Sequence, residues 1–396
     1  MPVPRDHHHD PLRVVIAGGG VAGLEALIEL RSLRASRVEV TLVSATPDFT
    51  YRALAVDEPF GLGNVTHFAL DRVCADHGAR FVQDHVTSVH TDRRVVELGD
   101  GSDLEYDVLI VAVGAHKVPA FEHGVSFDRD ASPGEFDEVL RDLRDGIAPR
   151  VAVVVPDSVT WTLPAYELAL LTRAWGENAA TIGGSVVIVT HEARPLAAFG
   201  AAVSAAVQRM LDDAGVAIQC RVASVDLLSA TALRVDGTWI PVDRIVSLPH
   251  NIGPHVIGLP CDAGGFIPVD EYGRVPGLDD VYAAGDGTTL PVKQGGLAAQ
   301  LADVVSRHIA AKLGTSSSAE PFRPVLRGLL HTPSGGRYVR AELDDPDGTS
   351  TISDQPLWWP PAKIASRSLS PYLARLDAEQ KGAALPQPYA QRLARH

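Results

Sequence analysis

Three glycines near the start of the chain have the spacing that a bound phosphate group requires. Gly18, Gly20 and Gly23 form the pattern G-x-G-x-x-G directly after a short apolar run and before a helical pattern. The first glycine permits a tight turn, the second lets backbone N–H groups approach a phosphate, and the third lets helix and strand pack closely. The chain is then expected to be helical over Leu24–Leu33, and the start of that helix adds donors and partial positive charge. Val21 and Ala22, within the motif, are also expected to contact the ligand. The motif predicts a site for the pyrophosphate of a dinucleotide.

Two further apolar strands end in residues that suit the same ligand. One ends at Ala112 and Gly114, and a later one ends at Gly285 and Asp286. Together with the opening glycines, these strand ends resemble the three markers of the two-dinucleotide-domain flavoproteins. The resemblance implies bound FAD, with Asp286 holding its ribityl–pyrophosphate region. A Rossmann domain that binds only a nicotinamide cofactor would leave Gly285 and Asp286 unexplained.

Other residues are expected to contact this cofactor by the same resemblance. Ser44 ends the second strand, where relatives carry an acidic residue that accepts hydrogen bonds from the adenosine ribose, and serine can do so more weakly. Arg52 is expected in a loop that covers the cofactor, and Val86 begins a short antiparallel segment beside it.

The second half of the α/β pattern lacks a glycine motif. The strand Val151–Val155 is followed by Pro156 and polar residues, and no glycine occurs between Gly146 and Gly176. A pyrophosphate there would meet side chains and a proline without an N–H, so nicotinamide binding in the usual pose is not expected. An NAD(P)H-oxidising flavoprotein with an unusual pose, in which Glu192 holds the ribose, remains an alternative.

Several segments narrow the resemblance to one branch of these flavoproteins. Pro164–Glu167 (PAYE), Thr190–Gly200 (THEARPLAAFG) and Leu290–Gln300 (LPVKQGGLAAQ) are similar to sulfide:quinone oxidoreductases and flavocytochrome c sulfide dehydrogenases. The similarity spans residues 12 to about 315, and the branch also holds type II NADH dehydrogenases.

The cysteine content departs from the chemistry of that branch. Sulfide oxidation in that branch uses a cysteine pair, and one of the two cysteines lies just before the PAYE run, where this chain has Trp161. The chain has three cysteines, Cys74, Cys220 and Cys261, and none forms a C-x-x-C pair. A mechanism that depends on a disulfide is therefore not expected.

Four residues are the catalytic candidates. Lys293, by resemblance, lies where a cation stabilises the negative charge of reduced flavin, or it is a solvated lysine at a helix start. Glu167 is expected at a helix start facing the flavin, where burial would raise its pKa and suit it to relay protons, or it has a structural role. Tyr166 and Trp161 are expected to line the same cleft, with core packing as the alternative for Trp161.

The order of strands and helices predicts an α/β fold with two Rossmann-like domains, each of three layers, the second inserted in the first. Residues 1–120 and 246–315 would form the FAD-binding domain, and 121–245 a degenerate NAD(P)-binding-like domain. The segment Arg244–Leu248 is expected to return the chain to the first domain, and residues 316–396 to form a C-terminal hairpin and helical region.

The C-terminal region combines an aromatic pair with basic residues. Trp358 and Trp359 precede a helical pattern from Ile364 to Leu376, with Lys363 among its basic residues. This composition fits peripheral contact with a membrane, and it also fits docking onto the body of the chain or onto a second subunit in a homodimer.

Composition limits the partners. The net charge of −14 argues against nucleic acid, and no apolar run is long enough to cross a bilayer, so we expect a cytoplasmic protein, with peripheral membrane contact left open. His7–His9 are expected in a polar tail, and no metal site is expected.

The sequence thus predicts an FAD-dependent oxidoreductase on a sulfide:quinone oxidoreductase-like scaffold. It would transfer two electrons from a small-molecule donor through FAD to a quinone, oxygen or another acceptor. The alternatives are an NAD(P)H-oxidising flavoprotein and a non-catalytic flavin-binding protein.

Overall fold

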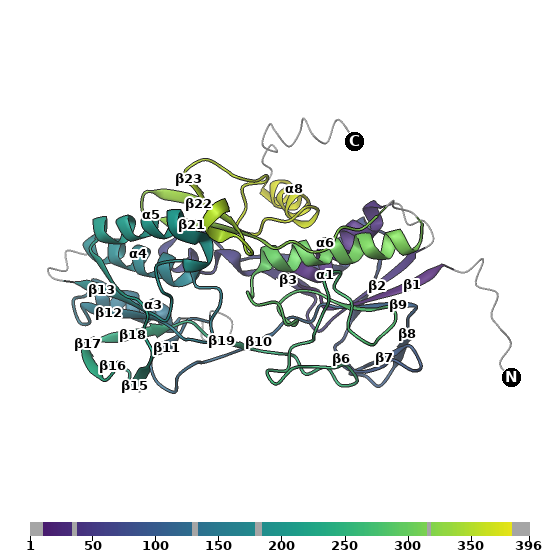
Figure 1. The fold of residues 1–396 in the computed structure, drawn as a ribbon, viewed down its shortest axis with the longest axis horizontal. Helices are drawn as coiled ribbons and strands as arrows, with labels where there is room; N and C mark the ends of the chain where they lie inside the picture. Colours follow the sequence, from purple (N-terminus) through teal and green to yellow (C-terminus); the bar gives the residue numbers. More distant parts are fainter. Residues whose placement is uncertain (1–10, 34–37, 129–133, 179–183, 315–317, 382–396) are drawn as a thin grey trace.

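The computed structural model describes residues 11–33, 38–128, 134–178, 184–314 and 318–381 (Figure 1). His7–His9 and part of the polar break at 315–319 lie outside the described residues. Two parallel sheets lie side by side, and the C-terminal elements cover the helices of both (Figure 1). The predicted α/β class with two Rossmann-like sheets is confirmed.

The first parallel sheet has the strand order β20-β9-β1-β2-β5. Its strands are β1 (Leu12–Ala17), β2 (Val38–Ser44), β5 (Arg80–Gln83), β9 (Val108–Val111) and β20 (Val281–Ala283). One face packs on α1 (Val21–Ser32) and α6 (Gly295–Lys312), and the other on the antiparallel meander β6 (Val86–His90), β7 (Val95–Leu98) and β8 (Asp103–Glu105). Within β1, Val14 and Ile16 face the helices and Val15 faces the meander. Burial on both faces explains why β1 is apolar throughout its centre.

The second parallel sheet has the order β11-β18-β12-β13-β14. Its strands are β11 (Val125–Ser126), β12 (Arg150–Val155), β13 (Ser185–Thr190), β14 (Val216–Gln219) and β18 (Arg244–Ser247). Helices α3 (Glu135–Arg144), α4 (Leu163–Asn178) and α5 (Gly200–Asp213) contribute to its core, and the other face meets the meander β15 (Val225–Ser229), β16 (Ala232–Val235) and β17 (Thr238–Pro241).

The prediction that Arg244–Leu248 returns the chain to the first domain is wrong. The strand β18, predicted to rejoin the first domain, pairs with β12 and β11 in the second sheet. The crossing between the sheets is the antiparallel pair β10 (His116–Val118) and β19 (His250–Ile252). An apolar strand carries no signal for which of two parallel sheets it joins, because both sheets bury both faces.

Shorter elements connect β2 to β5 along the chain. They are β3 (Asp48–Tyr51), β4 (Thr66–Ala69), α2 (Leu70–Asp76), and the short helices η1 (Arg52–Leu54) and η2 (Glu58–Phe60); a third short helix, η3 (Ala197–Phe199), precedes α5. Residues 104–113, whose alternating apolar pattern predicts one strand, are divided between two, since β8 belongs to the meander and β9 to the parallel sheet.

The C-terminal region docks onto the body of the chain. The predicted hairpin is confirmed as β21 (Val325–Thr332) and β22 (Gly335–Glu342), extended by α7 (Pro346–Thr349) and β23 (Thr351–Ser353). The helix α8 (Leu369–Lys381) begins later than the pattern predicted, and it buries Leu369, Tyr372, Leu373 and Leu376 in the core shared with α1. Its apolar face is therefore used within the chain. None of the helices in the described part of the chain is long and apolar enough to span a bilayer.

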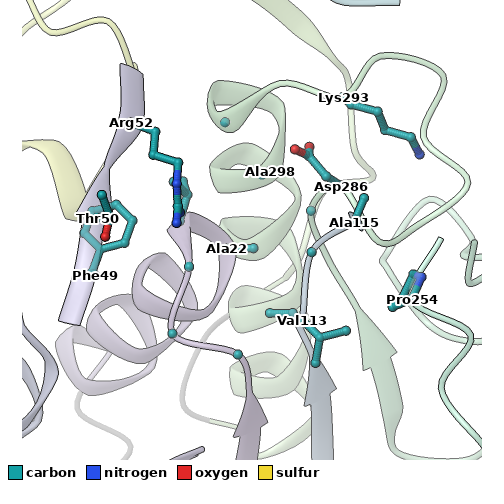
Figure 2. Close-up of a pocket in the computed structure, with 18 of the residues that line it drawn as sticks. Ala22, Phe49, Thr50, Arg52, Val113, Ala115, Pro254, Asp286, Lys293 and Ala298 are labelled. Atoms are coloured by element: carbon teal, nitrogen blue, oxygen red, sulfur yellow. The ribbon is translucent and has the colours of Figure 1, made fainter. Parts of the chain in front are cut away.

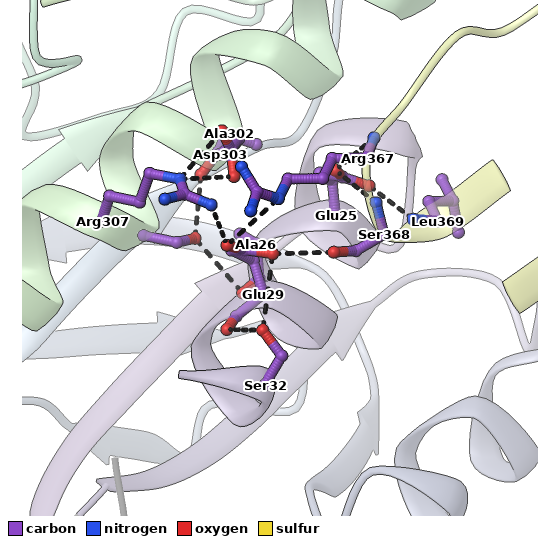
Figure 3. Close-up of polar contacts among 11 residues, drawn as sticks. Glu25, Ala26, Glu29, Ser32, Ala302, Asp303, Arg307, Arg367, Ser368 and Leu369 are labelled. Carbon is purple, nitrogen blue, oxygen red and sulfur yellow. Dashed lines mark hydrogen bonds and ion pairs between the residues drawn. The ribbon is translucent and has the colours of Figure 1, made fainter. Parts of the chain in front are cut away.

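A buried carboxylate on α1 fixes the start of α8. Glu25 is fully buried and accepts hydrogen bonds from the backbone N–H groups of Arg367, Ser368 and Leu369 at 3.0, 2.9 and 2.6 Å (Figure 3). Burial raises the pKa of Glu25 to about 7, against the three donors that favour its charged form. On the next turn of α1, Glu29 binds the Arg307 guanidinium and the Ser368 hydroxyl, both at 2.7 Å (Figure 3).

We expect Glu25→Ala to lower the free energy of unfolding by about 2 kcal/mol, because three buried backbone donors lose their acceptor. Glu25→Gln is the matched control, since its amide oxygen still accepts, and it should cost less. Urea unfolding measures both variants, and limited proteolysis of Glu25→Ala should cut the chain first near residues 360–369. Equal stability of Glu25→Ala and the wild type would contradict this assignment.

Candidate functional site

A cavity of about 920 Å³ lies at the carboxyl ends of the first parallel sheet. It is lined by the residues that follow β1, β2 and β9 and by the segment after β20. Ligands of open parallel sheets bind at this edge, where the loops after the strands meet, and the volume lies in the upper part of the roughly 300–1,000 Å³ typical of ligand pockets.

The glycine turn shapes one end of this cavity. Gly18 has φ +119°, and a Cβ atom there would lie 2.2 Å from the Ala112 carbonyl oxygen. A Cβ atom on Gly23 would lie 1.9 Å from the Gly18 carbonyl oxygen, whereas one on Gly20 would meet nothing within 4 Å. The first and third glycines are thus required by packing, and the second keeps space open.

The helix that follows the turn presents an uncapped N-terminus. Gly20 is the N-cap of α1 and offers no side chain, and no acidic residue lies in the first turn. Val21 and Ala22 line the cavity. The free N–H groups and the positive end of the helix dipole therefore favour an anion here.

Nearly all residues predicted to contact the cofactor line this one cavity. They are Gly18, Gly20, Val21, Ala22, Ser44, Arg52, Val86, Ala112, Gly114, Gly285, Asp286 and Lys293. The exception is Gly23, which lies behind the turn against Gly18.

Charged side chains face the cavity from opposite sides. Arg52 enters from the loop after β3, and Asp286 lies across from it, after β20 (Figure 2). Burial raises the pKa of Asp286, while the charges of Lys293 and Lys117 act against this shift. The Lys293 ammonium donates to the Thr288 carbonyl and lies 3.7 Å from the centroid of the Phe266 ring. Burial lowers the pKa of Lys293 to about 8.

The other end of the cavity reaches the second domain and the C-terminal region. Trp161 lines it from the segment before α4, Glu167 from the first turns of α4, and Lys363 from the segment before α8. The Trp161 ring packs beside Phe199, with centroids 5.9 Å apart.

The expectations for Tyr166 and Glu192 are wrong. Tyr166 does not line the cavity; it is fully buried and donates a 2.6 Å hydrogen bond to Glu192. The other carboxylate oxygen of Glu192 accepts from the Ala197 N–H at 3.0 Å. Glu192 is buried and occupied by these partners, so its carboxylate is not open to a nucleotide ribose.

Four ionisable side chains meet at this second end of the cavity, beside α4 and the C-terminal region, which we call its inner end. The Lys363 ammonium lies 3.0 Å from Asp57 and 2.8 Å from Glu167. His331 contacts Asp57 through Nδ1 at 2.6 Å, and its backbone N–H donates to Glu167 at 2.7 Å. Asp57, Glu167 and Lys363 have side chains at most 7% exposed, so their charges are stable only as a set. We call these four residues the buried charge cluster.

The two carboxyl groups of the buried charge cluster differ in acidity. Burial opposes the charge of Asp57, but the hydrogen bond from His331 and the nearby Lys363 outweigh it and lower the pKa. Burial raises the pKa of Glu167 despite the opposing charge of Lys363. Glu167 is therefore the carboxyl that more readily holds a proton, and it is the one that lines the cavity.

Sequence reasoning missed three members of this cluster. Asp57 and His331 carry no local motif, and Lys363 was named only among the basic residues of the C-terminal region, whereas it is buried in ion pairs. The ligand atoms of Asp57, Glu167 and His331 lie within 4.8 Å of one another, but the Lys363 ammonium already contacts both carboxylates.

None of the three cysteines lies in the described lining of the cavity. Cys74 is buried in α2, and Cys220 is half-buried after β14. Cys261 is exposed, with its sulfur 3.7 Å from Nδ1 of His255.

The fold and the cavity define the class of a dinucleotide-binding oxidoreductase. A family model described as pyridine nucleotide-disulphide oxidoreductase matches residues 12–304, and the chain belongs to this family.

Over the aligned residues, curated relatives are about a quarter identical in sequence to this chain. An NADH dehydrogenase-like protein of Mycobacterium tuberculosis is 26% identical, over 69% of this chain and 72% of the relative. Rhodocoxin reductase of Rhodococcus erythropolis is 28% identical, over 71% of this chain and 66% of that protein. Among solved structures, the sulfide:quinone oxidoreductase of Aquifex aeolicus is similar, with TM-score 0.78, 19% identity and 86% of each chain covered. That last likeness shows the fold.

Proposed function

We propose that the chain is an FAD-dependent oxidoreductase without a redox disulfide. It takes two electrons from a small donor and passes them through FAD to a quinone, oxygen or another acceptor. The observation that carries this proposal is the single cavity that runs from the glycine turn to the buried charge cluster.

The residues along the cavity fit FAD. The space above Gly20 and the uncapped start of α1 suit the pyrophosphate, and the half-buried Asp286 suits the ribityl hydroxyl groups as a hydrogen-bond acceptor. Arg52, across the cavity, supplies positive charge for the phosphates. Bound FAD would supply a ring system that accepts and returns two electrons.

The chain's own chemistry lies at the inner end. A quinone or another carbonyl acceptor must gain protons as well as electrons. Glu167 lies at the cavity wall, where burial raises its pKa; this suits it to relay protons to the acceptor, with Lys363 beside it to balance its carboxylate form. Trp161 closes the wall with an apolar surface on which a planar substrate can stack.

The donor is not handled by cysteine chemistry in this proposal. Trp161 stands where the resemblance places a reactive thiol, and the described cavity lining lacks a thiol that could form a mixed disulfide. The donor therefore gives its electrons directly to the cofactor.

Two glycine variants test the cofactor site. Gly20→Ala should keep the wild-type melting temperature, because its methyl group enters open space, yet weaken FAD binding at least about tenfold, since the methyl blocks the phosphate approach. Gly23→Ala is the matched control: its methyl group collides with the backbone of Gly18, so it should lower the melting temperature. FAD affinity is measured by flavin fluorescence titration. A colourless wild-type protein that takes up no FAD would overturn the proposal.

A substitution of Glu167 tests proton delivery. In Glu167→Gln, the chemically reduced flavin should be reoxidised by a water-soluble quinone about 100-fold more slowly than in the wild type, because the proton donor is gone. Ferricyanide is the matched control acceptor, since it takes electrons without protons, and its rate should be unchanged. Equal slowing with both acceptors would assign Glu167 a structural role instead.

NAD(P)H oxidation is the second candidate function, favoured by the NADH dehydrogenase-like relatives. Against it, β12 is followed by Pro156 where a glycine turn is needed, and Glu192 is occupied by Tyr166.

Stopped-flow mixing with NADH or NADPH separates the two candidates. We expect flavin absorbance to persist for many seconds at millimolar nucleotide, because the second sheet offers no open backbone turn for the pyrophosphate. Bleaching within milliseconds would establish the second candidate.

A further inference from the structure

A second cavity, separate from the flavin site, lies between α6, β21 and the segment before α8. Its volume is about 680 Å³. Its lining is rich in guanidinium groups and aromatic rings, namely Arg307, Arg323, Arg327, Arg367, Phe322, Trp358 and Trp359, and it also contains Glu25, Asp303 and Glu320.

Arg327 is an uncompensated cation in this cavity. It is half-buried on β21, directly opposite Arg340 on β22 in the strand register. Like charges at directly opposed positions of a sheet destabilise it. Arg340 is balanced by Glu342 at 3.1 Å, but within the described part of the chain no carboxylate forms an ion pair with Arg327. Burial and the charge of Arg340 lower the pKa of Arg327.

The acidic residues of the cavity are already engaged or exposed. Glu25 accepts three backbone hydrogen bonds, and Asp303 binds Arg307 at 3.0 and 3.1 Å (Figure 3). Glu320 is exposed. The charge of Arg327 is therefore left for a group from outside the chain.

Hydrogen bonds and a ring contact hold the segments around Arg327 in place. Gln300 on α6 brackets the start of β21, accepting from the Val325 N–H at 3.1 Å and donating to its carbonyl at 2.9 Å. The Trp358 indole donates to the Ala362 carbonyl at 2.9 Å, and its ring packs on Tyr338 with centroids 5.0 Å apart. The strand that carries Arg327 and the ring of Trp358 are therefore held in place, and a cation beside aromatic surfaces selects a ligand by charge and by shape.

We propose that this second cavity binds a small anion that carries a planar ring, recognised by Arg327 and by the aromatic residues Phe322, Trp358 and Trp359. The anionic group lies against the guanidinium and relieves its repulsion with Arg340, and the ring lies on the aromatic walls. Aromatic carboxylates and nucleoside monophosphates both have this chemistry. The site is independent of the flavin proposal, because its lining shares no residue with the first cavity.

The test is isothermal titration calorimetry on the full chain saturated with FAD, so that a nucleotide cannot occupy the first cavity. Benzoate and AMP are the two probes, and at least one should bind. Benzamide lacks the charge and inorganic phosphate lacks the ring, so each should bind at least about tenfold more weakly than the corresponding probe. Binding of benzoate alone identifies a carboxylate site, and binding of AMP alone a phosphate site.

Three variants test whether the probe binds at Arg327 in the second cavity. Arg327→Gln should weaken the probe at least about tenfold while keeping or raising the melting temperature, since it removes a like-charge contact. Arg141→Gln, an exposed arginine on α3 outside the cavity, is the matched control and should bind as the wild type does. Gly20→Ala alters only the first cavity and should also leave binding unchanged.

Four results would overturn the proposal: no binding of either probe at millimolar concentration, equal binding of benzoate and benzamide, unchanged affinity in Arg327→Gln, or lost binding in Gly20→Ala. The last would place the probe in the flavin site. A failure of FAD binding would leave the benzoate experiment intact, since it also runs on the protein without FAD.

Discussion

The buried charge cluster is the constraint on which the arrangement of the three parts of the chain depends. Asp57 comes from the loop before η2, Glu167 from α4, His331 from β21 and Lys363 from the segment before α8. Charges out of water are stable only when paired, and removal of one partner from a buried pair costs about 3–5 kcal/mol. The first sheet, the second sheet and the C-terminal region are therefore held in one relative position, which places Lys363 and Trp161 at the inner end of the first cavity.

The parts of the site that the sequence predicted are those with local physical causes. The spacing of Gly18, Gly20 and Gly23 follows from a turn that closes within six residues, and each glycine has its expected steric role or position. The strands β9 and β20, which lead to Gly114 and Asp286, were predictable for the same reason, since each is a short apolar run that stops at the sheet edge. Parallel pairing then brings these ends together.

The parts that the sequence did not predict depend on long-range contacts. Asp57, His331 and Lys363 lie on segments far apart in the chain, and no spacing rule relates them. The prediction that Tyr166 lines the cavity was wrong, and the helical period alone could have excluded it. At about 100° per residue, Pro164 and Glu167 share the face of α4 that lines the cavity, while Tyr166 points elsewhere and meets Glu192. The family motif gave the right segment, and the helical period decides which of its residues reach the substrate.

Two elements, β21 and the segment before α8, contribute residues to the lining of both cavities. Residues at alternate positions of a strand share a face, and on β21 Arg327 lines the second cavity, Leu329 lines the first, and His331 joins the buried charge cluster. The segment before α8 repeats this arrangement, since Lys363 lines the first cavity and Arg367 the second. Each of these elements presents side chains to two different cavities, so the position of its backbone sets the shape of both. The C-terminal region is thus built into the wall of both cavities.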